Sequence, residues 1–376
     1  MRSWTEYASA LAAAVTHDGS RWRAPVQTTP RHLFVPRWWQ RDDRGWVLRD
    51  GSLDEERWLH AAYADTSVIT RTGALHADQG MDGDRASGRP TSSATLPSLT
   101  VRMLQHARIQ DGHDLLDIGT GSGYGTALAC ARLGDAHVTS VDIDSYLVDA
   151  ARQRLAEVGH KPVLAAVDAT AELEDSYDRI VATVAVRPIP ASWLRALRPG
   201  GRLVATLAGT SLLITAEKDE DGGATGRVEW DRAGFMQARR GDDYPPGVTA
   251  VMDRARTEQG DVTTGPYPVV DVANAWDLDS MLSLTVPGIE HDYTETGERR
   301  TALMAHPDGS WARAEAVGHG RPSIHQGGPR RLWDTLDELR GYWLAHGELP
   351  VRGARVFIKP TGTTILARGC WHTILA

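Results

Sequence analysis

The sequence predicts an α/β fold built on an open, mostly parallel sheet, followed by a smaller α+β domain. A short apolar strand, a glycine-rich turn and a helix follow one another within residues 114–133. Strand and helix patterns then alternate to about residue 207, which is typical of a doubly wound sheet. The chain has 376 residues, and a length beyond that of one typical domain indicates a second one.

The segments before the glycine-rich turn are assigned from apolar spacing and from proline positions. They are a helix over 3–16, an extended segment over 29–39, a short helix over 55–65, a strand over 67–71, a polar loop over 77–93 and a helix over 97–107. The polar loop is long for a connection, and such length favours a functional role.

The segments after the turn continue the alternation. They are strands over 137–141, 162–167, 178–184 and 202–207, helices over 145–158 and 189–197, and a hairpin over 211–218 and 226–230. Mixed charges, prolines and glycines over 239–268 then mark a boundary. We therefore expect a first domain over 1–240 and a second over 245–376, the latter with a helix over 332–345 and a hairpin over 354–367.

The turn DLLDIGTGSGYG occupies residues 114–125. A dinucleotide-binding turn needs Gly-x-Gly-x-x-Gly, and no register of Gly119, Gly121 and Gly123 supplies it. A phosphate loop needs Gly-Lys-Ser/Thr, and this turn has no lysine. The remaining pattern, acidic-x-Gly-x-Gly-x-Gly, favours S-adenosylmethionine. That cofactor carries no phosphate, but its ammonium and sulfonium cations suit the carboxylate of Asp117.

Two further acids follow the next two predicted strands. The carboxyl ends of neighbouring parallel strands meet around a ligand at the switch point of such a sheet. Asp142 lies where a carboxylate can bind both ribose hydroxyls, and Asp168 where an acid meets the adenine amine. The alternative is that these acids only cap loops. The candidate cofactor-binding residues are Asp117, Gly119, Thr120, Gly121, Ser122, Gly123, Tyr124, Asp142, Ile143, Asp168 and Ala169.

Composition narrows the class of partner and the compartment. The net charge of −8 disfavours nucleic acid or an anionic membrane as the main partner. The two cysteines, Cys130 and Cys370, are far apart, which predicts a reducing, cytoplasmic location, with Cys130 a buried helical thiol. No apolar run is long enough for a membrane span. The histidines show no metal-ligand spacing, so no metal site is expected.

Several motifs resemble the protein-L-isoaspartate O-methyltransferase family over residues 29–237. They are TPRHLFVPR (29–37), DIGTGSGYGTALA (117–129) and RPIPASWLRALRPGGRLV (187–204). The resemblance implies a class I (Rossmann-like) methyltransferase domain and carboxyl O-methylation. The family's active-site loop runs Gly-Gln-Thr-Ile-Ser-x-Pro into a helix. Alignment on Pro97 places Ser93 at the threonine and Thr95 at the serine, so these two are the candidate catalytic residues. Helix capping is their alternative role.

The C-terminal sequence WDTLDELRGYWLAHGELPV and the tryptophan-rich N-terminus resemble methyltransferases of ribosomal peptide biosynthesis, which act with graspetides, lanthipeptides and lasso peptides. This implies methylation of an aspartate in a precursor peptide, an aspartimide product that can open to isoaspartate, and an ATP-grasp ligase as a candidate partner. We expect the second domain to dock the peptide, with Trp311 and Trp371 at its surface and Trp333 and Trp343 packed inward. Isoaspartyl repair is one alternative, and it is less favoured because the repair enzymes are expected to end near residue 240, whereas this chain continues to residue 376. A non-catalytic peptide-binding subunit is another.

Overall fold

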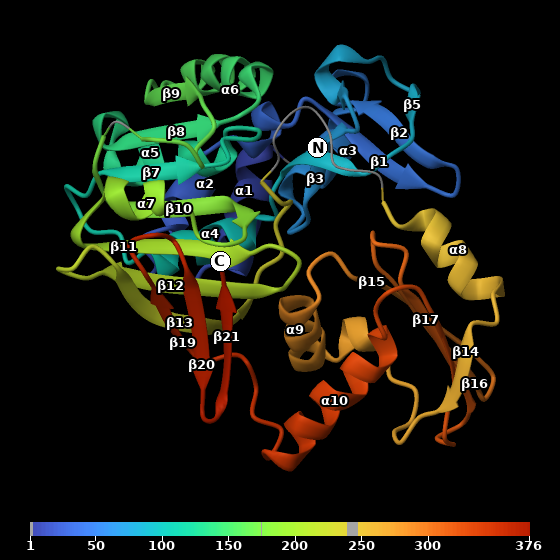
Figure 1. The fold of residues 1–376 in the computed structure, drawn as a ribbon. Coiled ribbons are helices and arrows are strands. Elements are labelled where there is room, and N and C mark those ends of the chain that lie inside the picture. Colours follow the sequence, from blue (N-terminus) through green and yellow to red (C-terminus); the bar gives the residue numbers. More distant parts are fainter. Residues whose placement is uncertain (1–2, 174, 239–246) are drawn as a thin grey trace.

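The computed structural model describes residues 3–173, 175–238 and 247–376, and the predicted boundary between 240 and 245 lies outside them. Within these ranges the chain forms a ten-stranded, a six-stranded and a five-stranded sheet (Figure 1). The strands of the ten-stranded sheet follow the order β21-β20-β19-β13-β12-β11-β10-β7-β8-β9.

The parallel half of the ten-stranded sheet positions the glycine-rich turn. Its strands are β7 (Leu115–Ile118), β8 (Val138–Asp142), β9 (Val163–Ala166), β10 (Tyr177–Val186) and β11 (Leu197–Leu207). β7 pairs with β8 on one side and β10 on the other, so the carboxyl end of β7 is the switch point of the sheet. The predicted α/β fold class is confirmed.

Helices cover both faces of this sheet. Neighbouring residues of a strand point to opposite faces, and Leu115 and Leu116 accordingly belong to different apolar clusters. The Leu115 cluster contains residues of α1, α4 and α5, and the Leu116 cluster contains residues of α7 and α9. The helices are α1 (Trp4–Val15), α2 (Arg23–Thr28), α3 (Glu55–Tyr63), α4 (Pro97–His106), α5 (Tyr124–Leu133), α6 (Ser145–Glu157), α7 (Ala191–Ala196), α8 (Thr249–Thr257), α9 (Trp276–Thr285) and α10 (Leu332–Ala345).

The six-stranded sheet lies before the glycine-rich turn and corrects two expectations. The end of the expected loop over 77–93 is a strand, β6, because its backbone pairs with β3; Ser93 lies opposite Ile69. The expected extended segment over 29–39 contains a 3₁₀ turn at Arg31–Phe34. The strands are β1 (Arg37–Asp42), β2 (Gly45–Asp50), β3 (Val68–Thr72), β4 (Leu75–His76), β5 (Arg85–Ala86) and β6 (Pro90–Ala94).

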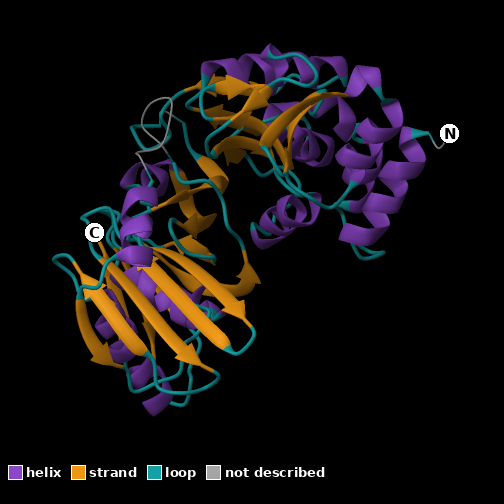
Figure 2. Cartoon of the chain, turned by 90° about the vertical axis from the view of Figure 1, so that its right-hand side faces the viewer, coloured by secondary structure: helices purple, strands orange, loops and turns teal. Residues whose placement is uncertain are grey.

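The C-terminal region divides between two sheets. Its own antiparallel sheet consists of β14 (Asp261–Thr264), β15 (Glu290–Thr296), β16 (Arg299–Ala305), β17 (Trp311–Val317) and β18 (Ser323–Gly327). Figure 2 shows these strands as one open sheet with helices behind it. The chain then returns to the ten-stranded sheet, where β19 pairs with β13. The strands beyond β11 in that sheet are β12 (Leu212–Lys218), β13 (Ala224–Arg232), β19 (Arg355–Ile358), β20 (Thr364–Arg368) and β21 (Trp371–Leu375).

This return divides the expected second domain over 245–376, because its last three strands belong to the ten-stranded sheet. The expected surface position of Trp311 is also wrong, since its side chain is buried against α8 and the five-stranded sheet. Trp333 is buried as expected. Trp343 and Trp371 are partly buried and line a second cavity of about 220 Å³ between α10 and the β20–β21 turn.

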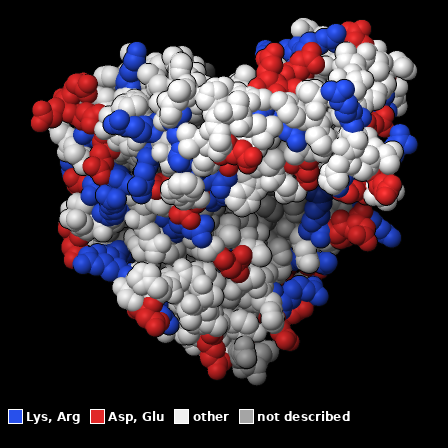
Figure 3. Space-filling model, turned by 90° about the horizontal axis from the view of Figure 1, so that it is seen from below, with Lys and Arg blue, Asp and Glu red and all other residues white. Residues whose placement is uncertain are grey.

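Two surface properties bear on partners. None of the helices in the described part of the chain is long and apolar enough to cross a membrane. Basic and acidic side chains are interspersed over the face seen in Figure 3.

Candidate active site

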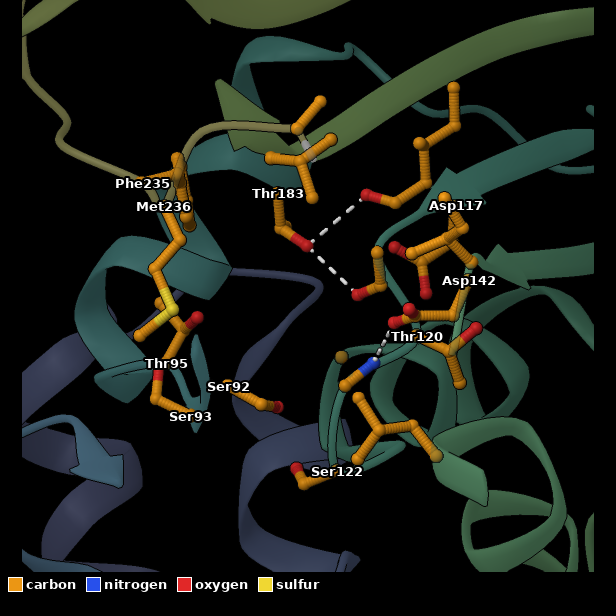
Figure 4. A pocket seen from close by; sticks show the side chains of 18 of the residues that line it. Ser92, Ser93, Thr95, Asp117, Thr120, Ser122, Asp142, Thr183, Phe235 and Met236 are labelled. Carbon is orange, nitrogen blue, oxygen red and sulfur yellow. Dashed lines mark hydrogen bonds between the residues drawn. The ribbon is translucent and has the colours of Figure 1, made fainter. Parts of the chain in front are cut away.

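A cavity of about 320 Å³ lies at the carboxyl ends of β7, β8 and β10. The glycine-rich turn forms one wall, and β6 with the start of α4 forms another (Figure 4). A third wall is the segment over 234–238, which bonds to the end of β10 through Ala185 N–H to Met236 O at 2.9 Å. All the predicted site residues except Gly123 line this cavity.

The glycines of the turn are required by backbone conformation and by close packing. Gly119, Gly121 and Gly123 have φ of 99°, 52° and 90°, which side-chain-bearing residues rarely adopt. A Cβ at Gly119 would lie 2.8 Å from Thr183 Oγ1, and one at Gly121 would lie 3.4 Å from the carbonyl oxygen of Ser93. Gly123 instead packs beneath the turn, where a Cβ would lie 3.0 Å from that of Ala151. Its absence from the cavity wall gives it a structural role.

Asp117 lies at the end of β7 and is almost fully buried. Its Oδ2 accepts hydrogen bonds from Thr126 Oγ1 at 2.7 Å and Ser140 Oγ at 2.9 Å. Burial raises the pKa of Asp117 to about 6, although both hydroxyl hydrogen bonds oppose the shift. A cation in the cavity would favour its charged form.

Asp142 connects β8 to the glycine-rich turn. Its Oδ2 accepts from Gly121 N–H at 3.0 Å (Figure 4). Its Oδ1 accepts from Asp144 N–H at 3.1 Å. Both bonds fix the carboxylate at the cavity rim. Asp168 lines the cavity beyond β9, where its Oδ1 accepts from the backbone and hydroxyl of Thr170 at 2.9 and 2.6 Å. Each of these two acids thus orders a loop and also lines the cavity, so a loop hydrogen bond does not exclude a role in ligand binding.

Ser93 and Thr95 face the glycine-rich turn across the cavity (Figure 4). Neither hydroxyl caps α4. The first turn of that helix is capped from elsewhere, by Asp65, whose Oδ1 accepts from Ser98 N–H at 2.8 Å. Within the described ranges, neither hydroxyl has a hydrogen-bond partner, so both are free to donate to a molecule in the cavity.

Several residues at the site were not found from the sequence. Thr183, Phe235 and Met236 line the cavity, and Thr183 Oγ1 donates to Gly119 O at 3.0 Å. Only the pairing of the segment over 234–238 with β10 brings the last two there. For Arg31 the sequence did offer a signal, because this residue lies in the TPRHLFVPR motif, but the motif alone does not tell what the side chain contacts.

Arg31 holds the wall that carries the two hydroxyls. Its fully buried guanidinium donates to Thr66 O at 3.2 Å, Ala94 O at 3.3 Å and Thr95 O at 3.2 Å, and it also contacts the carbonyl oxygens of Ala62 and Ala64. Burial lowers the pKa of Arg31 from 12.5 to about 10, so the group stays charged at neutral pH. Its removal would take one donor away from each of these carbonyl oxygens.

The carboxylates and the volume of the cavity fit S-adenosylmethionine. The volume is that of a small-molecule site, and three carboxylates face it, as suits a cationic nucleoside. Gly121 leaves open the space between the turn and β6 that a Cβ would narrow. No phosphate-binding lysine or arginine lines the cavity among the described residues.

Comparisons with known proteins agree with this geometry. The family described as "Protein-L-isoaspartate(D-aspartate) O-methyltransferase (PCMT)" matches residues 76–231. Protein-L-isoaspartate O-methyltransferase 2 of Rhodopseudomonas palustris (strain HaA2) is 32% identical over 186 residues, covering 48% of this chain and 79% of the relative. The protein-L-isoaspartate O-methyltransferase of strain BisB5 is 35% identical over 173 residues, covering 42% and 79%.

A solved structure of a protein-L-isoaspartate O-methyltransferase is similar in fold. The TM-score is 0.50 at 16% sequence identity, and the match covers 99% of both chains. The likeness in fold therefore extends over the C-terminal region, beyond the residues that the family match covers.

Proposed function

Because this chain belongs to the protein-L-isoaspartate O-methyltransferase family, and so is an S-adenosylmethionine-dependent carboxyl O-methyltransferase, we propose that its acceptor is an aspartate side chain in a ribosomally made precursor peptide. The observation that supports a carboxylate acceptor is the pair of hydroxyls of Ser93 and Thr95, which have no hydrogen-bond partner among the described residues and lie opposite the glycine-rich turn. The product is a methyl ester that closes to an aspartimide and can open to isoaspartate.

The lining of the cavity suits a carboxylate acceptor. Within the described residues it contains no histidine, cysteine, lysine or arginine. A carboxylate is ionised at neutral pH and needs no general base, unlike a hydroxyl or an amine. S-adenosylmethionine supplies an electrophilic methyl group on its sulfonium. Ser93 and Thr95 donate to the carboxylate and fix its direction of attack, and the surrounding walls exclude water.

The ester changes the chemistry of the acceptor itself. Methoxide replaces an oxygen that is a poor leaving group, so the backbone nitrogen of the following residue can attack the ester carbonyl. The new C–N bond closes the aspartimide ring, and methanol leaves with the amide proton. This step uses only atoms of the peptide and therefore needs no further group from the enzyme.

The C-terminal region supports a dedicated peptide. It contacts the cavity wall that contains β6, because Arg89, next to β6, forms an ion pair with Glu290 of β15 at 2.7 Å. The second cavity, with Tyr342, Trp343 and Trp371 in its lining, offers the aromatic surface that anchors peptides. The resemblance of the C-terminal sequence to methyltransferases of peptide biosynthesis is the reason to prefer an aspartyl precursor.

Isoaspartyl repair is the second candidate, favoured by the names of the relatives, which are protein-L-isoaspartate O-methyltransferases. The presence of a C-terminal region does not separate the two. The match to the solved structure of that name covers 99% of this chain, contrary to our expectation that such enzymes end near residue 240.

The test is a methyl-transfer assay with tritiated S-adenosylmethionine and four synthetic peptides. They share one sequence and carry aspartate or isoaspartate, each in linear and side-chain-bridged form. We expect methyl incorporation and methanol release with the bridged aspartyl peptide, with kcat/KM at least about tenfold above that of the linear isoaspartyl peptide. Preference for the isoaspartyl peptides would establish repair, and no turnover with any of the four would favour a non-catalytic subunit.

A further inference from the structure

Three potential metal ligands meet at the end of the sheet away from the cofactor cavity. They are Cys130 near the end of α5, Asp135 just before β8 and His160 between α6 and β9, and their ligand atoms all lie within 4.8 Å of one another. None of the three lines the cavity at the carboxyl ends of the strands. Two of the three side chains already contact each other, since His160 Nδ1 lies 2.8 Å from Asp135 Oδ1.

We propose that Cys130, Asp135 and His160 form a binding site for a divalent zinc-like cation. A thiolate sulfur, an imidazole nitrogen and a carboxylate oxygen are the ligands that Zn²⁺ takes, and three protein ligands leave a fourth tetrahedral position for water. Water can reach it, because the side chains of Asp135 and His160 are 31% and 23% exposed while Cys130 is buried. This site is independent of the proposed acceptor.

The second oxygen of Asp135 is held in place from the protein side. Its Oδ2 accepts from the backbone N–H of Lys161 at 2.6 Å, which fixes the carboxylate and leaves Oδ1 directed at His160. Such a bond to the backbone orients a ligand before the metal arrives. Coordination would replace the thiol proton of Cys130, which leaves to solvent. His160 would bind the ion through Nδ1, the ring nitrogen that faces Asp135.

A metal ion here would connect α5 with the segments that precede β8 and β9, at the end of the parallel strands away from the cofactor cavity. α5 begins directly after the glycine-rich turn and ends at Leu133, three residues beyond Cys130. Asp135 precedes β8, and His160 leads into β9. The ion would therefore bind the folded chain and not the unfolded one, so it should raise the thermal midpoint.

The test is titration of the purified, chelator-treated full-length protein with Zn²⁺, and separately with Co²⁺ as a spectroscopic probe. We expect one equivalent of Zn²⁺ to bind, a thiolate-to-cobalt absorption band to appear, and the thermal midpoint to rise. Cys130→Ser and His160→Gln should each weaken binding by at least about 100-fold and abolish the absorption band, because even indirect support of a ligand is worth about 10–100-fold.

The chain offers matched controls. Cys370→Ser removes the exposed second thiol. His137→Gln breaks a histidine–aspartate pair with the same 2.8 Å separation, between His137 Nδ1 and Asp114 Oδ1, that has no thiol beside it. Both variants should bind Zn²⁺ like the wild type. Binding that is absent, that has no sulfur-to-cobalt band, or that survives in Cys130→Ser would overturn the proposal. The unliganded thermal midpoint of each variant shows whether it folds.

Discussion

Asp142 is the residue on which cofactor affinity should depend most. It is fixed by backbone N–H groups on both sides, so its carboxylate faces the cavity in one orientation. In Asp142→Ala we expect S-adenosylmethionine binding to weaken by about 1.5–3 kcal/mol, the worth of hydrogen bonds to a charged group. Calorimetry measures this, with Asp149→Ala on the exposed face of α6 as the control. Unchanged affinity in a folded variant would remove Asp142 from the cofactor site.

Asp117 should make cofactor binding depend on pH. Its folded-state pKa of about 6 lies above its ordinary value of 3.8, so the free folded protein holds a proton that the unfolded chain releases. Its contribution to stability is therefore full below about pH 4 and is lost as the pH rises through about 6. A cationic cofactor favours the ionised form, so its affinity should rise about tenfold from pH 5 to pH 7. The increase should be absent in Asp117→Asn, and an equal increase in that variant would contradict the assignment.

The positions of single residues at the site were predicted best from the sequence. Asp117, Asp142 and Asp168 end successive parallel strands, and the carboxyl ends of such strands necessarily meet. Spacing could not tell that Gly123 packs under the turn against Ala151, because α6 approaches it from a distant part of the chain. The Cys130–Asp135–His160 cluster was missed for the same reason.

At the scale of elements, helix α4 separates a capping role from a catalytic one. Its cap is Asp65 on a neighbouring loop, and the described hydroxyls of Ser93 and Thr95 accept no hydrogen bond from the amides of the helix. Asp65→Ala should lower the free energy of unfolding by about 1 kcal/mol, and the two single alanine variants at 93 and 95 by less than about 0.5 kcal/mol. Urea unfolding measures all three. A loss in Thr95→Ala as large as in Asp65→Ala would make Thr95 a structural residue.

Element positions were predicted well where a pattern is local and poorly where pairing decides. The helices over 145–158 and 332–345 have clear apolar faces, and the structure has α6 and α10 there. The segment over 77–93 has no regular spacing of apolar residues, yet it ends in β6. That strand forms because its backbone pairs with β3, and no local pattern in the sequence indicates this pairing.

The last three strands, β19 to β21, complete one edge of the ten-stranded sheet. Val356, Ile358 and Leu366 are buried in the same cluster as residues of β10 and β11. A chain that ends after residue 353 should therefore lose cooperative unfolding and cofactor binding, because it exposes this core and the edge of β13. Trp371→Ala, which leaves the strands in place, should keep both. A soluble shortened chain with wild-type cofactor affinity would show that the C-terminal strands are an accessory.

The hairpin over 354–367 was predicted, but its place in the ten-stranded sheet was not, because a pairing such as that of Arg227 with Arg355, far apart in the sequence, leaves no local pattern. This is also why removal of the C-terminal region cannot test peptide docking by itself.

The central claim is that the hydroxyls of Ser93 and Thr95 hold the acceptor carboxylate opposite the cofactor site. The most direct measurement is the single-turnover rate of methyl transfer by Ser93→Ala/Thr95→Ala, with enzyme in excess and with the best of the four peptides. We predict a rate at least about tenfold lower, because each lost hydrogen bond to a charged group is worth about 1.5–3 kcal/mol, with S-adenosylmethionine affinity within about twofold of wild type. A wild-type single-turnover rate would contradict the account.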